Sequence, residues 1–114
     1  MAGVITAKQT FTNNNTSQTL RGAQNPSVSE AIKYGQEQHK LYNPGSTYKL
    51  NRQIPGTFLR PDALDAGNKV IRELKPDNQQ AINRGLSQLQ KYIDAADSAL
   101  GKGFTGVIDT YKKR

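Results

Sequence analysis

The stretch that decides the fold runs from residue 59 to residue 76 and has the sequence LRPDALDAGNKVIRELKP. At its centre lie Gly67 and Asn68, two residue types that tolerate the positive φ angles of tight turns. The segments on both sides have the length and composition of short strands. The stretch therefore predicts an antiparallel β-hairpin over residues 58–75, with Gly67 and Asn68 as its two-residue loop.

The loop length determines which residues of this hairpin face each other. With two loop residues, Asp62 lies directly opposite Glu73. Because side chains alternate along a strand, Asp62 and Glu73 share a face with Lys75, whereas Asp65 points to the opposite face. The register thus selects Asp62 rather than Asp65 as the partner of Glu73. The neighbouring predicted pairs are Leu64 with Ile71 and Asp65 with Val70.

Two facing carboxylates repel each other unless a cation lies between them. Carboxylate oxygens favour Mg²⁺, for which Mn²⁺ can substitute, so Asp62 and Glu73 are expected to be the metal ligands. Lys75, two residues after Glu73, is expected to orient a water molecule or to stabilise developing negative charge. Taken singly, a glutamate two positions before a lysine mostly marks a solvated strand face. The pairing with Asp62 is what favours a site that can hydrolyse a phosphodiester.

Beyond the hairpin, apolar residues at helical spacing predict two helices. The first covers residues 28–42 and ends before the turn at residues 43–45. The second follows a cap at Asp77 or Asn78 and ends at Gly101. Further strands are expected at residues 47–51 and 104–111. The apolar face of the first helix is expected to contain Val28, Ala31, Ile32, Gly35, His39 and Tyr42.

These elements give the order α-β-β-β-α-β within one mixed α/β domain over residues 28–114. Residues 1–27 are dominated by small polar side chains and are expected to form an arm or linker. A short strand at residues 3–6 is compatible with the sequence, but nothing in the sequence indicates its partner.

The composition narrows the possible partners and metals. Sixteen Lys and Arg against nine Asp and Glu give a net charge of +7, which favours nucleic acid as the partner, with solubility or an acidic protein as the alternative explanations. The chain has no cysteine and one histidine, so a metal must be held mainly by oxygen. No apolar run approaches the roughly 20 residues that span a membrane, and residues 1–9 lack the pattern of a classical signal peptide.

The hairpin residues resemble the PD-(D/E)xK nuclease superfamily, which has the restriction-endonuclease-like fold. Pro61 and Asp62 match its first element, and Glu73, Leu74 and Lys75 match its second. The resemblance covers roughly residues 27–111. It implies a mixed central sheet flanked by helices and metal-dependent cleavage of nucleic acid.

The same run is most similar to the C-terminal nuclease domains of bacterial polymorphic toxins. That similarity implies an effector used in bacterial competition, delivered by a specialised secretion system and acting in the cytoplasm of the target cell. It also implies a small acidic immunity protein that covers the site or a neighbouring basic face. These expectations rest on the resemblance, since a fold alone does not specify a function.

The exonuclease branches of the superfamily complete the site with a Gln and a Tyr four positions apart on the next helix, a spacing that Gln88 and Tyr92 share. Gln88 is expected to position the substrate or water, and Tyr92 is equally compatible with the core and with substrate binding. For His39, a structural role is favoured over a catalytic one, although it is a candidate for a position beside the site. Phosphate contacts are expected from Arg60, Arg84 and Lys91, with plain solvated charge as the even alternative.

Three functions are compatible with these observations. The first is a Mg²⁺-dependent DNase toxin, and the second is an RNase toxin of the same fold, including a tRNase. The third is a basic nucleic-acid-binding or protein-binding module without catalysis. DNA is favoured over RNA, but no residue distinguishes the two substrates.

Overall fold

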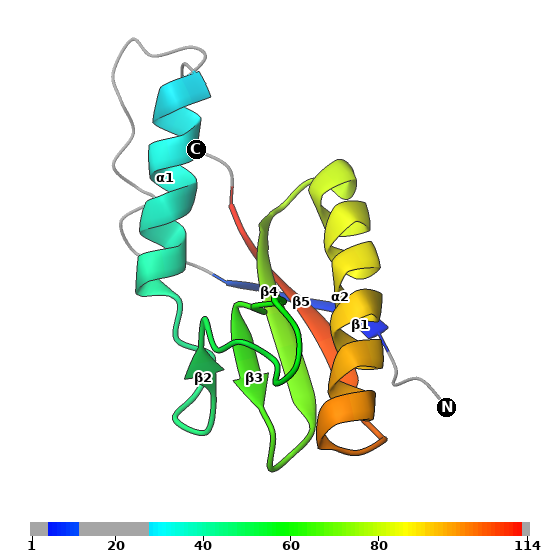
Figure 1. The fold of residues 1–114 in the computed structure, drawn as a ribbon. Helices are drawn as coiled ribbons and strands as arrows, with labels where there is room; N and C mark the ends of the chain where they lie inside the picture. Colours follow the sequence, from blue (N-terminus) through cyan, green and yellow to red (C-terminus); the bar gives the residue numbers. More distant parts are fainter. Residues whose placement is uncertain (1–4, 12–27, 113–114) are drawn as a thin grey trace, which may run out of the picture.

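The computed structural model describes residues 5–11 and 28–112, and within these ranges it contains two helices and five strands (Figure 1). The five strands form one sheet in the order β1-β5-β4-β3-β2, with α1 and α2 on opposite sides of it. From α1 onward, the predicted order α-β-β-β-α-β is confirmed. The elements are β1 (Ile5–Phe11), α1 (Val28–Leu41), β2 (Lys49–Leu50), β3 (Ala63–Asp65), β4 (Val70–Pro76), α2 (Gln79–Leu100) and β5 (Thr105–Tyr111).

The sheet is mixed, as the resemblance implied. β3 is antiparallel to both β2 and β4, whereas β5 is parallel to both β4 and β1. β4 is the central strand of the five, with β5 and β3 on its two sides, and α2 connects β4 to β5 across one face of the sheet. β1 lies within the segment that was expected to be an arm or linker, and its partner is the C-terminal strand. The division of the chain at residue 28 stays a prediction.

The hairpin formed by β3 and β4 has the predicted register, because Leu64 pairs with Ile71 and Asp65 pairs with Val70. The predicted two-residue loop is wrong: residues 66–69 form a four-residue turn, and the positive φ angle (58°) belongs to Lys69. The reason lies in the side chain of Asp65, which closes the turn in place of another backbone pair. Its carboxylate accepts hydrogen bonds from the backbone N–H of Asn68 (2.9 Å) and from the side-chain amide of the same residue (2.8 Å).

The main apolar core lies between α2 and the sheet. Asn78 caps the helix by accepting a 2.8 Å hydrogen bond from the backbone N–H of Ala81, and Gly101 ends it with a φ of 104°. The buried face of α2 follows the predicted helical spacing and packs on the strands. Its buried residues are Ala81, Gly85, Leu89, Ile93 and Ala96, and the strand side chains in this core include Leu64, Ile71 and Ile108.

The other face of the sheet is covered by α1, and the predicted apolar face of this helix is wrong except at Tyr42, which is buried as expected. Ile32 is 56% exposed and His39 is also exposed, whereas Tyr34 and Gln38 are buried. The reason is that this side of the sheet combines the small apolar patch of Ala63 and Leu74 with buried polar groups. It includes the buried carboxylate of Asp109, which accepts a hydrogen bond from the Tyr42 hydroxyl. Tyrosine side chains can pack against the sheet and still reach polar partners, which isoleucine cannot do.

Candidate functional site

The candidate site lies where β3 and β4 separate. The last pair between these strands is Ala63 with Arg72, but β4 continues as far as Pro76. Beyond this point the side chain of Asp62 binds β4 in place of a backbone group of β3, because its Oδ2 accepts a 2.8 Å hydrogen bond from the backbone N–H of Leu74. The carboxylate thus supplies an acceptor to a strand edge that β3 no longer pairs, and this fixes Asp62 beside β4.

The carboxylates of Asp62 and Glu73 adjoin, as the register predicted. The backbone N–H of Asp62 donates a 2.5 Å hydrogen bond to Oε2 of Glu73, whose side chain is buried. Burial, followed by the negative charge of Asp62, raises the pKa of Glu73 to about 7 from its ordinary value of 4.5. The folded protein therefore holds two acidic groups whose joint ionisation is unfavourable in the absence of further positive charge.

His39 reaches this pair from α1. Its Nε2 lies 3.2 Å from Oδ2 of Asp62, and its Nδ1 lies 2.9 Å from the carbonyl oxygen of Gly35. A carbonyl oxygen only accepts hydrogen bonds, so Nδ1 carries a proton, and a proton on Nε2 is favoured by the facing carboxylate. The hydrogen bond to Asp62 accordingly raises the pKa of His39, although burial opposes the shift. The structure thus places His39 beside Asp62, the predicted metal ligand. The sequence had favoured a structural role for His39 over a catalytic one, with a position beside the site as a possibility.

A cavity of about 260 Å³ opens beside Asp62. Asn51 contributes to its wall with a positive φ of 52°, and its backbone N–H donates a 3.1 Å hydrogen bond to the carbonyl oxygen of Asp62. Sequence reasoning did not identify Asn51, because a loop residue gives no periodic signal. Tyr42 could have been found, since it lies one helical turn after His39. The cavity is lined by His39, Tyr42, Leu50, Asn51 and Asp62.

Lys75 lies under α2, on the side of the sheet that Glu73 also faces. A Cβ atom on Gly85 would come within 3.1 Å of Cγ and 3.3 Å of Cε of Lys75. The absence of a side chain at Gly85 therefore makes room for the Lys75 stem between helix and sheet. Lys75 thus lies on the face of β4 that the alternation of side chains along the strand predicted.

Gln88 and Tyr92 follow Gly85 on the same face of α2. Oε1 of Gln88 is buried and has no hydrogen-bond partner among the described residues. Tyr92 packs against the main core, yet burial and then the charges of Glu73 and Asp62 raise its pKa to about 12. Tyr92 thus borders the core and lies within electrostatic range of the carboxylates, and its part in substrate binding stays a prediction.

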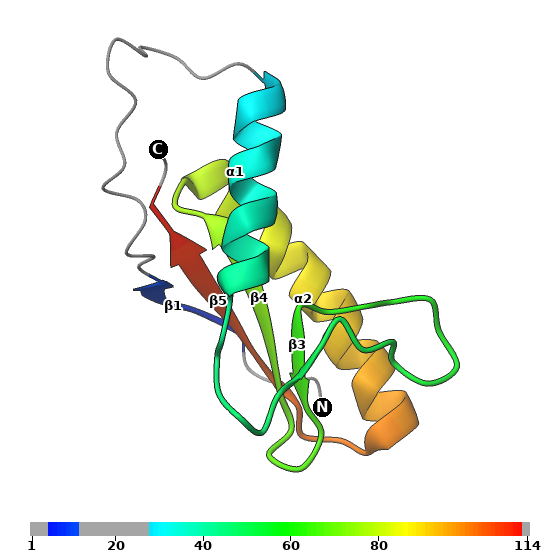
Figure 2. The ribbon, with the colours of Figure 1, turned by 90° about the vertical axis from the view of Figure 1, so that its left-hand side faces the viewer.

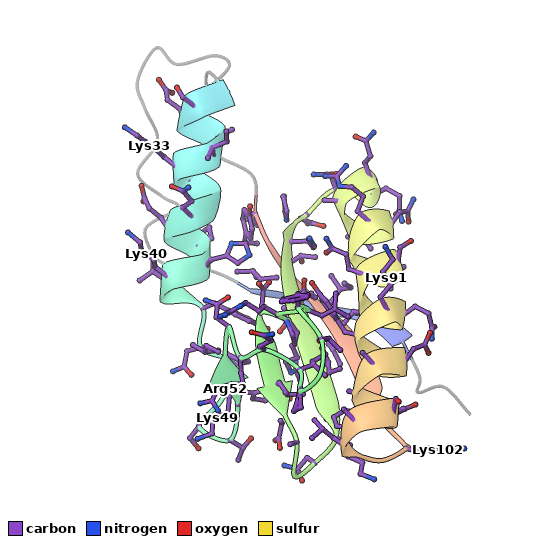
Figure 3. The ribbon with its side chains drawn as sticks, in the orientation of Figure 1. Lys33, Lys40, Lys49, Arg52, Lys91 and Lys102 are labelled. Carbon is purple, nitrogen blue, oxygen red and sulfur yellow. The ribbon has the colours of Figure 1, made fainter. Side chains whose placement is uncertain are left out.

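The three residues expected to contact phosphates are all exposed. Arg60 is oriented by 3.3 Å hydrogen bonds from its guanidinium group to the carbonyl oxygen of Asn51 and to Oε1 of Gln53. Figure 3 shows Lys91 on α2, whereas Lys33 and Lys40 extend from the outer side of α1. The positive charge is therefore distributed over several faces, and only part of it lies near the carboxylates. The three residues are Arg60, Arg84 and Lys91.

A buried polar network, which sequence reasoning missed, holds the C-terminal end of α1 on the sheet. Nη1 of Arg72 lies 2.9 Å and 3.1 Å from the two carboxylate oxygens of Asp109, and Nε of Arg72 donates a 2.9 Å hydrogen bond to the Tyr48 hydroxyl. The Tyr42 hydroxyl donates to the same aspartate. Since Tyr42 is three residues after His39, this network also fixes where His39 meets Asp62.

The side chains at the site determine which kind of metal site they can form. Within residues 5–11 and 28–112, no group of three or more His, Cys, Asp and Glu side chains is arranged to hold an ion. The hydrogen bonds of Asp62 and Glu73 use Oδ2 and Oε2, which leaves Oδ1 and Oε1 for a cation as far as the described residues are concerned. Mg²⁺ prefers oxygen and keeps several of its waters. Two carboxylates therefore fit an open Mg²⁺ site, and they do not fit a closed cage of protein ligands.

Comparison with protein families agrees with this geometry. Residues 27–111 match the model of a family described as restriction endonuclease fold toxin 9. The chain belongs to this family. The match supports a toxin domain of the nuclease type. It also confirms the restriction-endonuclease-like fold that the hairpin residues led us to expect. No curated protein and no solved structure matches the chain. Among the described residues, no helix is long and apolar enough to cross a membrane.

Proposed function

We propose that this toxin domain is a metal-dependent nuclease that hydrolyses phosphodiester bonds of DNA. The observation that supports the proposal is the adjacency of Asp62 and Glu73 at the point where β3 leaves β4, with Lys75 on the face of β4 that Glu73 shares. The raised pKa of Glu73 supports it further, because a cation would offset the repulsion that contributes to the shift.

In this proposal, Asp62 and Glu73 hold the cation through their carboxylate oxygens. When bound, Mg²⁺ supplies positive charge that offsets the two carboxylates and the negative charge developing on the phosphate. Lys75 either stabilises the same charge through its ammonium group or takes a proton from the attacking water. Water adds to phosphorus and loses a proton, either to the neutral amine of Lys75 or to solvent water, the bond to the leaving oxygen breaks, and the leaving oxygen takes up a proton from solvent.

Gln88 and His39 act beside the carboxylates. The buried Oε1 of Gln88, which lacks a partner among the described residues, is suited to accept a hydrogen bond from water at the site. The imidazole of His39 holds the Asp62 carboxylate from the opposite side. In this proposal, Gln88 therefore positions a water molecule, and His39 positions the metal ligand Asp62.

The substrate would bind through its phosphates. Arg60 precedes the carboxylates on the loop before β3, whereas Arg84 and Lys91 extend from α2. Together with the net charge of +7 they provide contacts that do not depend on base sequence. Tyr92, at the edge of the core, is the fourth candidate contact. This arrangement accepts DNA, and RNA is the alternative that the assay below distinguishes.

A cell that produces such a nuclease needs protection from it. We therefore propose a small acidic immunity protein that binds the basic surface or covers the carboxylates. The toxin family also supports delivery into a target cell, with the cytoplasm as the proposed place of action. Expression of the domain with and without the neighbouring reading frame tests the partner, and harmless expression of the active domain alone would contradict it.

The central test is cleavage of supercoiled plasmid DNA by the purified domain in Mg²⁺, compared with Mg²⁺ plus excess EDTA. Cleavage is expected only without EDTA, and it is expected to be lost in Glu73→Ala and Lys75→Ala. Lys33→Ala is the matched control, because it removes one positive charge from the outer side of α1 (Figure 3). Total RNA and tRNA are incubated in parallel. Cleavage that persists in EDTA would contradict the mechanism, and cleavage of RNA alone would replace DNA as the substrate.

A further inference from the structure

The loop of residues 51–62, between β2 and β3, presents the most exposed large apolar side chain of the described residues. Phe58 is 95% exposed, whereas Ile32, Leu50 and Leu41 are between 47% and 56% exposed. Figure 2 shows the loop reaching out from the sheet before it returns to β3. A single exposed apolar residue is ordinary on a protein surface. The structure of the loop beneath Phe58 is what gives this residue significance.

Hydrogen bonds within the loop hold Phe58 outward. The backbone N–H of Ile54 donates to the carbonyl oxygen of Leu59 (2.9 Å), and the N–H of Thr57 donates back to the carbonyl oxygen of Ile54 (3.1 Å). The Thr57 hydroxyl donates to the same carbonyl (2.8 Å) and accepts from the N–H of Leu59 (3.1 Å). These bonds fix the residues on both sides of Phe58.

Two side chains anchor this loop in the main core. Ile54 is fully buried there, and Leu59 packs against the same cluster. Phe58 therefore cannot turn inward without displacing Leu59 or breaking the hydrogen bonds of the turn. The backbone that carries the ring is already ordered, so binding through Phe58 would remove less conformational freedom than binding through a loose loop, which favours its use as a contact residue.

The surroundings of Phe58 indicate what it contacts. The loop that carries Phe58 also contributes two exposed arginines, Arg52 and Arg60, and the guanidinium group of Arg60 is itself held by hydrogen bonds within the loop. An aromatic anchor of a protein interface normally lies at the centre of an apolar patch. An isolated ring on a loop that also carries cations is typical of surfaces that bind nucleic acid, where bases stack on aromatic side chains and cations contact the backbone.

The distance along the chain places Phe58 near the reaction. Asp62 is the fourth residue after Phe58, so their Cα atoms are at most about 14 Å apart. We infer that Phe58 stacks against a base of the substrate strand close to the cleaved bond. This inference rests on the proposed nuclease function.

Phe58→Trp gives a direct spectroscopic test, because the chain has no tryptophan. The variant is made in the Lys75→Ala background, so that a single-stranded oligonucleotide stays intact in Mg²⁺. Stacking is expected to quench the tryptophan fluorescence on binding. An oligonucleotide of the same length that lacks all its bases is then compared. Quenching should disappear with this base-free strand, because its phosphates remain but no base can stack on residue 58.

Affinity measurements in the same background provide the second readout. Phe58→Ala is expected to weaken binding of the intact oligonucleotide between about 5-fold and 100-fold, whereas Phe58→Tyr should bind like the parent. On the base-free oligonucleotide, Phe58→Ala should cause no further loss. Ile32→Ala is the matched control, because it removes an exposed apolar side chain from α1. Unchanged melting temperatures verify that the variants are folded.

Each result separates this inference from the proposed function. If the parent protein cleaves DNA or RNA, and Phe58→Ala binds as well as its parent without any tryptophan quenching, the inference is wrong and the nuclease function stands. If Phe58→Ala weakens only the binding of the cognate inhibitor protein, Phe58 is a protein anchor and the inference is again wrong. A folded parent that neither binds nor cleaves any nucleic acid in Mg²⁺ contradicts both.

Discussion

The Glu73 carboxylate accepts a 2.5 Å hydrogen bond from the backbone N–H of Asp62, so the two acidic residues are held together through the main chain although their charges repel each other. Asp62 in turn binds the backbone N–H of Leu74. Each acidic residue is thus bound to the backbone of the opposite strand. The two strands separate at this point, yet the acidic side chains are fixed relative to each other.

Asp62→Asn is expected to lower the rate of Mg²⁺-dependent cleavage by at least about 100-fold, because it removes a charge from the proposed cation site. Asp65→Asn is the matched control in the same hairpin. Asp65 accepts hydrogen bonds from Thr47 and Asn68 on the other side, so its replacement should lower the melting temperature and leave cleavage nearly unchanged. The measurement is the initial rate of plasmid nicking. Loss of cleavage in Asp65→Asn alone would reverse the assignment.

The metal-free protein is expected to lose stability as pH rises from about 4.5 to about 7. The folded pKa of Glu73 is raised, so its contribution to stability is fully present below pH 4.5 and is lost as the pH passes the folded value of about 7. The full shift corresponds to about 3 kcal/mol. The raised pKa of His39 acts in the same direction.

Urea unfolding in EDTA at pH 5, 6, 7 and 8 measures this dependence. Glu73→Gln should make the free energy of unfolding much less dependent on pH, and the remaining slope should report His39. Mg²⁺ should restore stability to the parent protein at pH 8 and have little effect on the variant. A parent protein whose stability rises over the same interval would show that Glu73 is not strained by its neighbours.

Gly85→Ala is expected to destabilise the protein by about 1 kcal/mol, even though alanine is the better helix former. The added Cβ would lie 2.7 Å from Cδ1 of Ile108, which is fully buried, and 3.1 Å from Cγ of Lys75. Displacement of Lys75 should also lower kcat. Ile108→Val removes the nearest atom, so Gly85→Ala should cost less in that background. Equal costs in both backgrounds would exclude this contact as the cause.

Tyr42→Phe should lower both stability and cleavage. It removes the hydroxyl that binds Asp109, and hydrogen bonds to charged groups contribute about 1.5 to 3 kcal/mol. Tyr34→Phe is the matched control, because it removes a hydroxyl from the same helix that donates a 3.0 Å hydrogen bond to a neutral group, the carbonyl oxygen of Lys112. Unfolding curves and kcat at saturating DNA are compared. If Tyr34→Phe lowers kcat as much as Tyr42→Phe does, Tyr42 has no special role in positioning His39.

Much of the fold could be predicted because its signals are local. Alternation and the Gly67-Asn68 centre predicted the register of β3 and β4, although the turn is longer and Lys69 has the positive φ. Helical spacing also predicted α2 together with its cap. The same reasoning failed for α1, where the buried face is formed by tyrosines that bind polar groups from distant strands. The interactions that decide α1 are non-local, and hydrophobic spacing does not report them.

The candidate site divides in the same way. The juxtaposition of Asp62 and Glu73 follows from a hairpin register, so it could be predicted from residues close in sequence. The contact between His39 and Asp62 depends on where α1 docks, and the cavity wall at Asn51 depends on a loop conformation. The Arg72 and Asp109 pair joins β4 to β5 and left no motif in the sequence.

The way in which α1 docks on the sheet affects how readily the site opens. The cavity beside Asp62 is lined partly by His39 and Tyr42. α1 packs on the sheet through a small cluster that includes Tyr34, Ala63 and Leu74, whereas the larger core between the sheet and α2 contains no residue of α1. Proteins open in cooperative units, and units with few apolar contacts open at lower free energy than the whole fold. Hydrogen exchange should therefore be faster in α1 than in α2. A partner protein that binds α1 and holds it away from the sheet would inactivate the domain while most of it remains folded.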